Sequence, residues 1–331
     1  MNMIIKEVFL DSEKNKIKAF LKRFDLDLDL DVTETFYVEE EGVVIATVSL
    51  SNYIIKCLAV DEDYRGENLA VALVGDAINR LLARHQTFYQ VFTKLIYRDI
   101  FLNLGLRLVI ETKNVAVLES SAYPITQYLS DLKKQLNLAT LDIGAIVVNC
   151  NPMTLGHLYL IEAAAKNHAR LLLFVLQEER SLFTYPERFE LVKLGTQHLA
   201  NVLVLPSSPY LVSNLTFPSY FMKEESARNS EYAHLDAEIF KQYFMPILGI
   251  RRRYIGTETH PTMQAYNQAL KDVLGDGLLE IKRLQKDGKD ISASMVRALI
   301  SKQEVESALE FVPKAARARL REICLQKFKT K

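Results

Sequence analysis

Two short segments of the chain carry residues whose types and spacing suit phosphate chemistry. The first, Asn149-Cys-Asn-Pro-Met-Thr-Leu-Gly-His157, follows the apolar run Ile143 to Val148. We expect that run to form a strand and a helix to begin near the histidine. The free N–H groups and positive dipole end of such a helix favour an anion, Gly156 allows close backbone approach, and His157 adds a donor aimed at the same point. The segment therefore predicts a phosphate site at the carboxyl end of a strand.

The second segment, Asp290-Ile-Ser-Ala-Ser-Met-Val-Arg297, lies far along the chain from the first. Ser292 or Ser294 can cap the helix that follows, and Arg297 lies about one turn into that helix. Two hydroxyls, free backbone N–H groups and a guanidinium would then converge on phosphate oxygens. This segment predicts a second part of a phosphate site.

Each segment alone also has a plainer explanation. Thr154 can be only a helix cap with His157 on the surface of the first turn, and the serines can be an ordinary cap followed by one solvated arginine. The two segments together indicate a phosphate site more specifically than either segment does alone. We therefore expect them to build one site.

The composition is that of an ordinary globular protein. Of 331 residues, 25% are charged and 49% are hydrophobic, and 41 basic residues balance 41 acidic ones. These proportions argue against disorder and coiled coil, and the balanced charge removes the basic excess that nucleic-acid binding usually needs. The longest apolar runs, Ile143 to Val148 and Ala169 to Leu176, fall short of the roughly 20 residues that cross a bilayer. We expect neither a nucleic-acid nor a membrane partner.

The cysteines and the start of the chain indicate the compartment. Cys57, Cys150 and Cys324 lie far apart in no metal-ligand spacing, and an odd number does not make a disulfide framework. The segment Met1 to Glu7 lacks the features of a secretory signal. We expect reduced thiols, no metal site and a cytoplasmic protein. Cys150 adjoins the first phosphate segment, and we favour packing over chemistry for it because free cysteines are usually buried.

The spacing of hydrophobic residues changes along the chain and indicates two modules with a connecting helix. The first module mixes strands and helices, with a hairpin over Thr35 to Leu50 and a strand-loop-helix unit over Tyr53 to Leu81. Pro124 can open a helix that runs to Leu136, because proline is accepted in a first helical turn. We set the domains at 1–124 and 141–331, with a linker helix over 125–140.

The second module alternates strand and helix, and its last part contains three short helices from Ser294 to Phe328. The predicted elements up to that point are strands at Ile143 to Val148, Leu171 to Leu176, Val202 to Leu205 and Arg253 to Gly256, and helices at Leu158 to Lys166 and Glu187 to His198. This alternation predicts an α/β fold with a parallel sheet and crossover helices.

The pair of phosphate segments resembles the signatures of the HxGH-type nucleotidyltransferases, with Thr154 where many members have the first histidine. The resemblance extends to the [citrate (pro-3S)-lyase] ligase family and covers nearly the whole chain. The blocks that carry it are Asn149 to His157, Arg180 to Phe183, Arg188 with Leu191-Val192, Thr216 to Phe221, and Tyr254 to Gly256.

The first module is similar to the acyl-CoA loop of GNAT-type acetyltransferases, which this ligase family carries in front of its nucleotidyltransferase domain. The similar residues are Leu58-Ala-Val-Asp61 and Tyr64-Arg-Gly-Glu-Asn-Leu-Ala70. Asn68 stands at a usual glycine position, and asparagine tolerates left-handed backbone angles better than most residues. No acid and base pair for acetyl transfer to an amine is identifiable, so we expect a vestigial or carrier-binding role for this module.

The resemblance implies a fold and a reaction. The fold is α/β, a GNAT-like domain with a mixed sheet followed by a Rossmann-like, cytidylyltransferase-like domain with a parallel sheet. Acetate attacks ATP to give acetyl adenylate and pyrophosphate, and the acetyl group passes to the thiol of a CoA-like prosthetic group on the acyl carrier subunit of citrate lyase, which activates the lyase. Mg²⁺ accompanies ATP with its own oxygen ligands, and no tightly bound cofactor is expected.

The resemblance also implies site residues. Thr154, His157 and Arg297 take the catalytic roles, as groups that bind and stabilise charge rather than as nucleophiles. The nucleotide is expected to bind at Asn149, Asn151, Gly156, Arg180, Gly256, Ser292 and Ser294. The CoA-like group is expected to bind at Arg65, Gly66, Asn68 and Ala70.

Several charged residues keep two explanations. Arg180, Arg188 and Lys223 can support pyrophosphate or solvate helix faces, and Arg180 is the best placed of the three. Glu258 can face the nucleotide or be a solvated loop carboxylate. The basic residues from Lys314 to Lys331 can form a solvated helix face or a docking surface for an acidic carrier protein.

Three functions remain to be weighed. The first is the acid-thiol ligase that forms AMP and pyrophosphate. The second is an adenylyltransferase that acts on a mononucleotide or a phosphopantetheine-type substrate. Such enzymes usually lack the leading acetyltransferase-like module. The third is an acyl-carrier binding protein with a decayed ATP site, against which the retained Thr154, His157, Ser292 and Arg297 argue.

Overall fold

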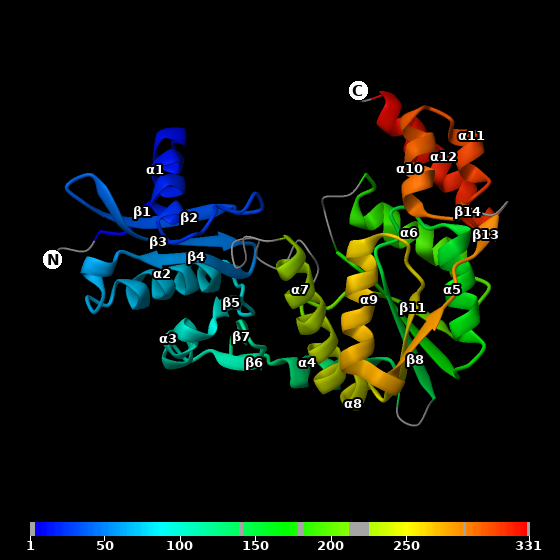
Figure 1. Cartoon of the computed structure of the whole chain (residues 1–331), viewed down its shortest axis with the longest axis horizontal. Coiled ribbons are helices and arrows are strands. Elements are labelled where there is room, and N and C mark those ends of the chain that lie inside the picture. The colour runs from blue at the N-terminus through cyan, green and yellow to red at the C-terminus, as the bar shows by residue number, and fades with distance from the viewer. Residues whose placement is uncertain (1–3, 139–141, 178–181, 212–224, 287–288, 330–331) are drawn as a thin grey trace. The chain divides into compact units, whose positions relative to one another are not determined.

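The computed structural model describes residues 4–138, 142–177, 182–211, 225–286 and 289–329 (Figure 1). The chain forms two compact units. The described residues up to Tyr128 belong to the first unit together with Glu225 to Leu235, and the other described residues form the second. No helix in the described ranges is long and apolar enough to cross a membrane.

The first unit is built on a seven-stranded mixed sheet in the order β1-β2-β3-β4-β5-β7-β6. Strands β4 and β5 run parallel, and the other neighbours in this order run antiparallel. The strands are β1 (Lys6–Glu7), β2 (Glu34–Glu40), β3 (Val43–Ser51), β4 (Ile54–Val60), β5 (Gln90–Lys94), β6 (Arg107–Glu111) and β7 (Val115–Glu119). The mixed sheet predicted for this half of the chain is confirmed.

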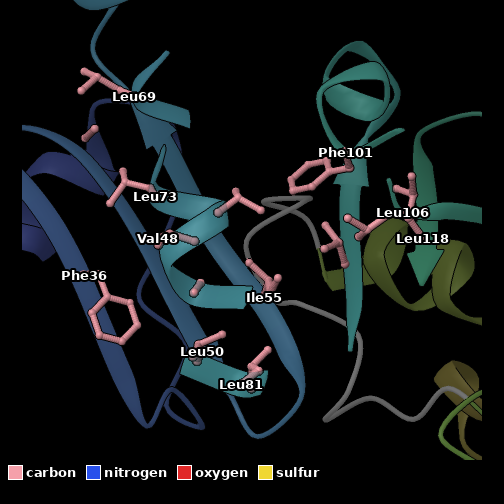
Figure 2. Close-up of a cluster of buried hydrophobic side chains, with 14 of the residues drawn as sticks. Phe36, Val48, Leu50, Ile55, Leu69, Leu73, Leu81, Phe101, Leu106 and Leu118 are labelled. Atoms are coloured by element: carbon pink, nitrogen blue, oxygen red, sulfur yellow. The ribbon is translucent and has the colours of Figure 1, made fainter. Parts of the chain in front are cut away.

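Helices cover both faces of this sheet because its strands alternate their apolar residues between the faces. On one face Phe36 packs with Leu73 and Leu81 of α2 (Leu69–Ala83), as Figure 2 shows. On the other face Tyr37 packs with residues of α1 (Asp11–Lys22). The unit also contains η1 (Glu62–Tyr64), η2 (Leu95–Tyr97), α3 (Arg98–Asn103) and the start of α4 (Ile125–Gln135).

Strand β4 carries a bulge that opens the middle of the sheet. Its register with β3 shifts where Cys57 adopts a left-handed φ of 52°. Strands β4 and β5 pair only at Ile54 and Ile55, and beyond that point they part. A cavity of about 430 Å³ lies there, lined by residues of both strands and by the loop that leads into α2.

The second unit is built on a five-stranded parallel sheet in the order β10-β9-β8-β11-β12. The strands are β8 (Ile143–Val148), β9 (Arg170–Val175), β10 (Val202–Pro206), β11 (Ile250–Gly256) and β12 (Leu278–Ile281). A short hairpin of β13 (Gln285–Lys286) and β14 (Lys289–Asp290) follows. The predicted parallel sheet is confirmed, with β8 at its centre.

Crossover helices connect these strands, and small helices complete the unit. They are α5 (Leu155–Ala165), α6 (Tyr185–Thr196), the end of α7 (Glu225–Ile239), a π-helical stretch η4 (Phe240–Phe244), α8 (Met245–Leu248), α9 (Pro261–Leu274), η5 (Gly275–Gly277), α10 (Ala293–Ser301), α11 (Val305–Leu309) and α12 (Lys314–Lys329). The helix predicted over Leu158 to Lys166 therefore begins at Leu155, because Thr154 caps it.

The grouping of α7 differs from the predicted domain ranges, which assign all residues after 140 to one domain. Glu231 is buried and accepts hydrogen bonds from Thr112 and Asn114, in the turn between β6 and β7. These contacts join Glu225 to Leu235 to the first unit. The domain limits of 1–124, 125–140 and 141–331 stay a prediction.

At the amino end of the central strand β8, the buried side chains of His168 and Tyr254 form a polar chain with the exposed Asp142. The His168 Nδ1 atom lies 3.2 Å from an Asp142 carboxylate oxygen, and the Nε2 atom lies 2.8 Å from the Tyr254 hydroxyl on β11. The imidazole occupies the space in front of Gly144, where an added Cβ would lie 2.4 Å from the ring. Glycine at this position is therefore a packing requirement of the sheet.

We predict that Gly144→Ala destabilises the protein by about 1–3 kcal/mol, because the held imidazole cannot retreat from the new methyl group. As a control, Gly75→Ala in α2 meets no atom within 4 Å. That change should be neutral or stabilising by about 0.5–1 kcal/mol, from helix propensity. Thermal unfolding of both variants measures the difference, and equal stability of Gly144→Ala and wild type would contradict the packing argument.

Candidate functional site

The loop after β8 is held at two points by arginines from different helices. Arg188 of α6 is fully buried, and its Nη1 donates to the backbone oxygen of Asn149 at 2.6 Å. Arg297 of α10 donates from Nη1 to the backbone oxygen of Asn151, also at 2.6 Å. The Asn151 side-chain oxygen accepts from the backbone N–H of Phe183 at 3.3 Å. Asn149 and Asn151 thus shape the loop, and Arg188 is an interior residue rather than a helix-face cation.

Thr154 and His157 form a reciprocal capping box at the start of α5. The Thr154 hydroxyl accepts from the His157 backbone N–H at 3.4 Å, and the Thr154 backbone N–H donates to His157 Nδ1 at 3.1 Å. Because Nδ1 accepts, the proton of the neutral ring lies on Nε2. Thr154 is fully buried, and its contacts fix the tautomer and direction of the His157 ring.

The environment of His157 keeps the ring neutral. Burial, and to a smaller extent the charge of the Arg283 guanidinium, together lower the pKa of this imidazole to about 4. A neutral Nε2–H is a hydrogen-bond donor throughout the physiological pH range. His157 is therefore suited to hold a phosphate oxygen and unsuited to act as a general base through Nδ1.

The two phosphate segments meet at Gly156. A Cβ added there would lie 2.6 Å from the backbone oxygen of Ile291, the residue before Ser292. Ser292 caps α10 by accepting from the Met295 backbone N–H at 3.2 Å, and its hydroxyl lies 3.0 Å from that of Ser294. The convergence that the sequence suggested is present, and glycine is required for it.

Two of the first-turn N–H groups of α5 already have partners. The Leu155 N–H donates to the backbone oxygen of Phe311 at 2.8 Å, and the His157 N–H donates to Thr154. The expectation of a free helix start is therefore wrong for these two groups. Charge for a bound phosphate must come chiefly from side chains.

Arg297 supplies such a charge. It is partly buried, and burial lowers the pKa of its guanidinium. Among the described residues no carboxylate forms an ion pair with it, and its guanidinium donates to the neutral backbone oxygen of Asn151. A desolvated cation without an acidic partner is suited to an anionic ligand.

Glu258 and Arg283 lie at the same carboxyl edge of the sheet, after β11 and β12. Arg283 Nη2 is 2.5 Å from a Glu258 carboxylate oxygen. Burial raises the pKa of the Glu258 carboxyl, although Arg283 opposes that shift. Glu258 is thus a paired carboxylate rather than a solvated one. Arg283 was not predicted from the sequence, although its place after a strand end was a usable signal.

Gly256 ends β11, and its backbone oxygen accepts from the Asn267 amide at 2.9 Å. A Cβ at Gly256 would meet nothing within 4 Å, so the packing of the described protein does not itself require glycine there. Arg180, Lys223 and the block Thr216 to Phe221 lie outside the described residues.

Cys150 and the basic C-terminal residues have structural explanations. Cys150 is buried in the apolar core below the loop, and burial raises the pKa of its thiol to about 12. The other two cysteines are also buried, and neither forms a disulfide. In the C-terminal helix α12, Arg319, Arg321 and Lys327 pair with Glu190, Glu306 and Glu187.

The cavity of the first unit contains the four residues predicted to bind a CoA-like group. Gly66 and Asn68 both have left-handed backbone angles, with φ of 96° and 59°, so asparagine takes the place of glycine at the start of α2. Asn68 makes no side-chain cap there, and Arg65 pairs with Glu62 at 2.9 Å. The described lining is mostly apolar and includes Lys56, Arg65 and Lys94 but no acidic residue.

Lys56 is fully buried and its charge is balanced from within the unit. Its ammonium lies 2.7 Å from Asp31 and 3.3 Å from Asp29. Arg65 is likewise paired with Glu62, so Lys94 is the lining cation without an ion pair among the described residues. Among the described residues no group of three or more His, Cys, Asp or Glu side chains could hold a metal ion.

Comparison with known proteins places the chain in a family. Residues 143–319 match the model of the citrate lyase ligase C-terminal domain. The chain is 37% identical to a [citrate [pro-3S]-lyase] ligase of Escherichia coli over 90% of this chain and 87% of the relative. It is 41% identical to a phosphopantetheine adenylyltransferase of Symbiobacterium thermophilum, over 19% of this chain and 40% of the relative.

A solved structure of an acyl-CoA N-acyltransferase from Pseudomonas aeruginosa covers 36% of this chain and 100% of its own chain. Its sequence identity is 11% and its TM-score is 0.33. The family match spans the parallel-sheet unit with both phosphate segments, and the ligase match extends over most of both chains. The chain therefore belongs to the citrate lyase ligase family.

Proposed function

We propose that this protein activates acetate with ATP and transfers the acetyl group to the thiol of a CoA-like prosthetic group on the acyl carrier subunit of citrate lyase. The observation that carries the proposal is the contact between Gly156 and Ile291, which brings both phosphate segments to one site in a member of the citrate lyase ligase family. The three buried free thiols agree with a reducing, cytoplasmic setting.

The first half-reaction is a substitution at phosphorus. A carboxylate oxygen of acetate bonds to the α-phosphorus of ATP, the bond from that phosphorus to the bridging oxygen breaks, and pyrophosphate leaves with the electron pair. Such a step needs positioning and charge stabilisation more than a protein nucleophile. In the second half-reaction the carrier thiolate attacks the acetyl carbonyl carbon, and AMP leaves.

Side chains of the site suit these needs. The Nε2–H of His157 is proposed to bind a non-bridging oxygen of the α-phosphate, with Arg297 as the adjacent cation. Ser292, Ser294 and the backbone near Gly156, Asn149 and Asn151 are proposed to hold the rest of the nucleotide, with Gly256 beside it and Arg180 as a further phosphate ligand. Mg²⁺ is proposed to enter with ATP, bound mainly by phosphate oxygens and water.

The cavity of the first unit is proposed to hold the CoA-like arm of the carrier. Its apolar walls suit a pantetheine chain, and Arg65 and Lys94 suit the phosphates. The uncapped start of α2, with Gly66, Asn68 and Ala70, offers backbone N–H groups to the same phosphates.

The alternative of a free-standing adenylyltransferase for a mononucleotide or a phosphopantetheine-type substrate is not favoured. The match to a phosphopantetheine adenylyltransferase covers a fifth of the chain, whereas the match to a ligase covers nine tenths. Exchange of labelled pyrophosphate into ATP tests the proposal. It should depend on acetate and not on mononucleotides or phosphopantetheine.

We predict that His157→Ala lowers acetate-dependent pyrophosphate exchange by about a hundredfold, because it removes one donor to the charge that develops on phosphate. Tyr159→Ala on the same helix is the matched control, since Tyr159 is 42% exposed. Circular dichroism checks that both variants fold. Normal exchange by folded His157→Ala would exclude this residue from the reaction.

The charge state of His157 can be measured directly. Because its folded pKa of about 4 lies below the ordinary value of 6.5, the folded protein resists protonation of this ring. The stability linked to this group is therefore complete above about pH 6.5 and falls as the pH drops towards 4. An NMR titration of the ring protons, assigned with His157→Ala, should give a midpoint near 4. A midpoint near 6.5 would contradict the neutral-donor role.

The two half-reactions should separate on substitution in the first unit. We expect Arg65→Ala to leave pyrophosphate exchange unchanged and to raise the KM for the carrier by about tenfold, the cost of one charged hydrogen bond. Arg107→Ala on the exposed edge of β6 is the control. If the first unit only stabilises the protein, Arg65→Ala will instead lower both half-reactions together or neither.

A further inference from the structure

Arg283 is a charged residue at the carboxyl edge of the parallel sheet that the proposed function does not yet use. We infer that Arg283 is a further phosphate-binding residue of the adenylation site, positioned by Glu258, with the β- and γ-phosphates of ATP as its ligand. The inference rests on the proposed function for the identity of the ligand, ATP.

The backbone places Arg283 beside the second phosphate segment. In the hairpin, Gln285 pairs with Asp290, and Leu284 accepts from the Ile291 backbone N–H at 3.1 Å. Continuing this antiparallel register by one step sets Arg283 opposite Ser292, the cap of α10. Ile291, between them, is the residue whose oxygen packs against Gly156. The backbone of Arg283 therefore lies next to the second phosphate segment, which in turn contacts the first segment at Gly156.

Two contacts fix the direction of Arg283. Its backbone N–H donates to the Thr257 hydroxyl at 3.0 Å, and its guanidinium meets Glu258 at 2.5 Å. Thr257 is in turn bound to β12, through its N–H and the Ile281 oxygen at 2.9 Å. A guanidinium carries five N–H donors, so one carboxylate leaves capacity for a second oxyanion.

Electrostatics agrees with this placement. The charge of Arg283 contributes to the lowered pKa of His157, which agrees with the placement given by the hairpin register. The Arg283 and Glu258 side chains remain 25% and 19% exposed, which leaves the pair accessible to a ligand. A triphosphate brings several negative charges, and Arg297 with its contact to Asn151 offsets only part of them.

The test compares Arg283→Met, Arg283→Lys and Glu258→Gln in the full chain. Arg251→Met is the matched control, because the Arg251 side chain is 73% exposed and its ion pair within the described part of the chain is a distant one, 3.9 Å from Asp142. Three constants are measured: the KM for ATP and the KM for acetate in pyrophosphate exchange, and the calorimetric Kd for inorganic pyrophosphate. Thermal unfolding is measured for each variant to check that it is folded.

We expect Arg283→Met to raise the KM for ATP and the Kd for pyrophosphate by about tenfold or more, the loss of one charge-assisted contact, with the KM for acetate unchanged. Arg283→Lys should recover part of this loss, since it keeps the charge but not the planar fork. Glu258→Gln should raise the same two constants by less, with kcat unchanged. Values equal to those of Arg251→Met, or an effect on acetate alone, would overturn the inference.

Failure of the proposed function would look different. If the wild type shows no acetate-dependent exchange, that proposal fails, while the pyrophosphate Kd of Arg283→Met still decides the role of Arg283. If Arg283→Met does not fold, Arg283→Lys decides in its place. A Kd for pyrophosphate unchanged by the lysine substitution would then count against the inference.

Discussion

The packing of the Ile291 backbone oxygen against Gly156 is the constraint on which the site depends. These residues are far apart in sequence, and no side chain can stand between them, because a Cβ at 156 would come within 2.6 Å of that oxygen. The contact sets the first turn of α5 against the start of α10. His157 follows Gly156 directly and Ser292 follows Ile291 directly, so one close backbone approach aligns both segments. Arg297 then reaches back to the oxygen of Asn151 and holds the loop from the other side.

The direction of His157 follows from the same helix start. The Thr154 hydroxyl accepts from the His157 backbone N–H, and the Thr154 backbone N–H donates to His157 Nδ1. Many HxGH-type nucleotidyltransferases have a histidine at the position of Thr154. In this chain the buried Thr154 orients the histidine that remains, His157. The His157 N–H, which could otherwise bind an anion, is occupied by the Thr154 hydroxyl. The Leu155 N–H is occupied by the Phe311 backbone oxygen. In the proposed site, the side chains of His157, Arg297 and Arg283 therefore take over the stabilisation of phosphate from the helix amides.

Much of this fold could be predicted, because its strongest signals are local. The run Ile143 to Val148 is apolar throughout and bounded by polar residues, and it forms β8 over that range. The start of α5 was predicted three residues late, because the glycine that serves the Ile291 contact weakens a helix signal. Arg283 lies in the charged run Lys282 to Asp290 and resembles a solvated loop. The hydrogen bond from Thr112 to Glu231 joins residues 119 positions apart, so no local sequence pattern could predict it.

The two units use helix starts in opposite ways, and this separates their chemistry. In the second unit Thr154 caps α5, and charged side chains must meet the ligand. In the first unit Asn68 holds a left-handed angle without capping α2, beside a cavity that the Cys57 bulge in β4 opens. Backbone amides there remain the natural partners of a ligand, and such contacts favour binding of a phosphate without polarising a reacting bond. A capped start with convergent cations suits the adenylation step, and an uncapped start over an apolar cavity suits retention of a long phosphorylated arm. The division of labour proposed for the two units follows from that difference.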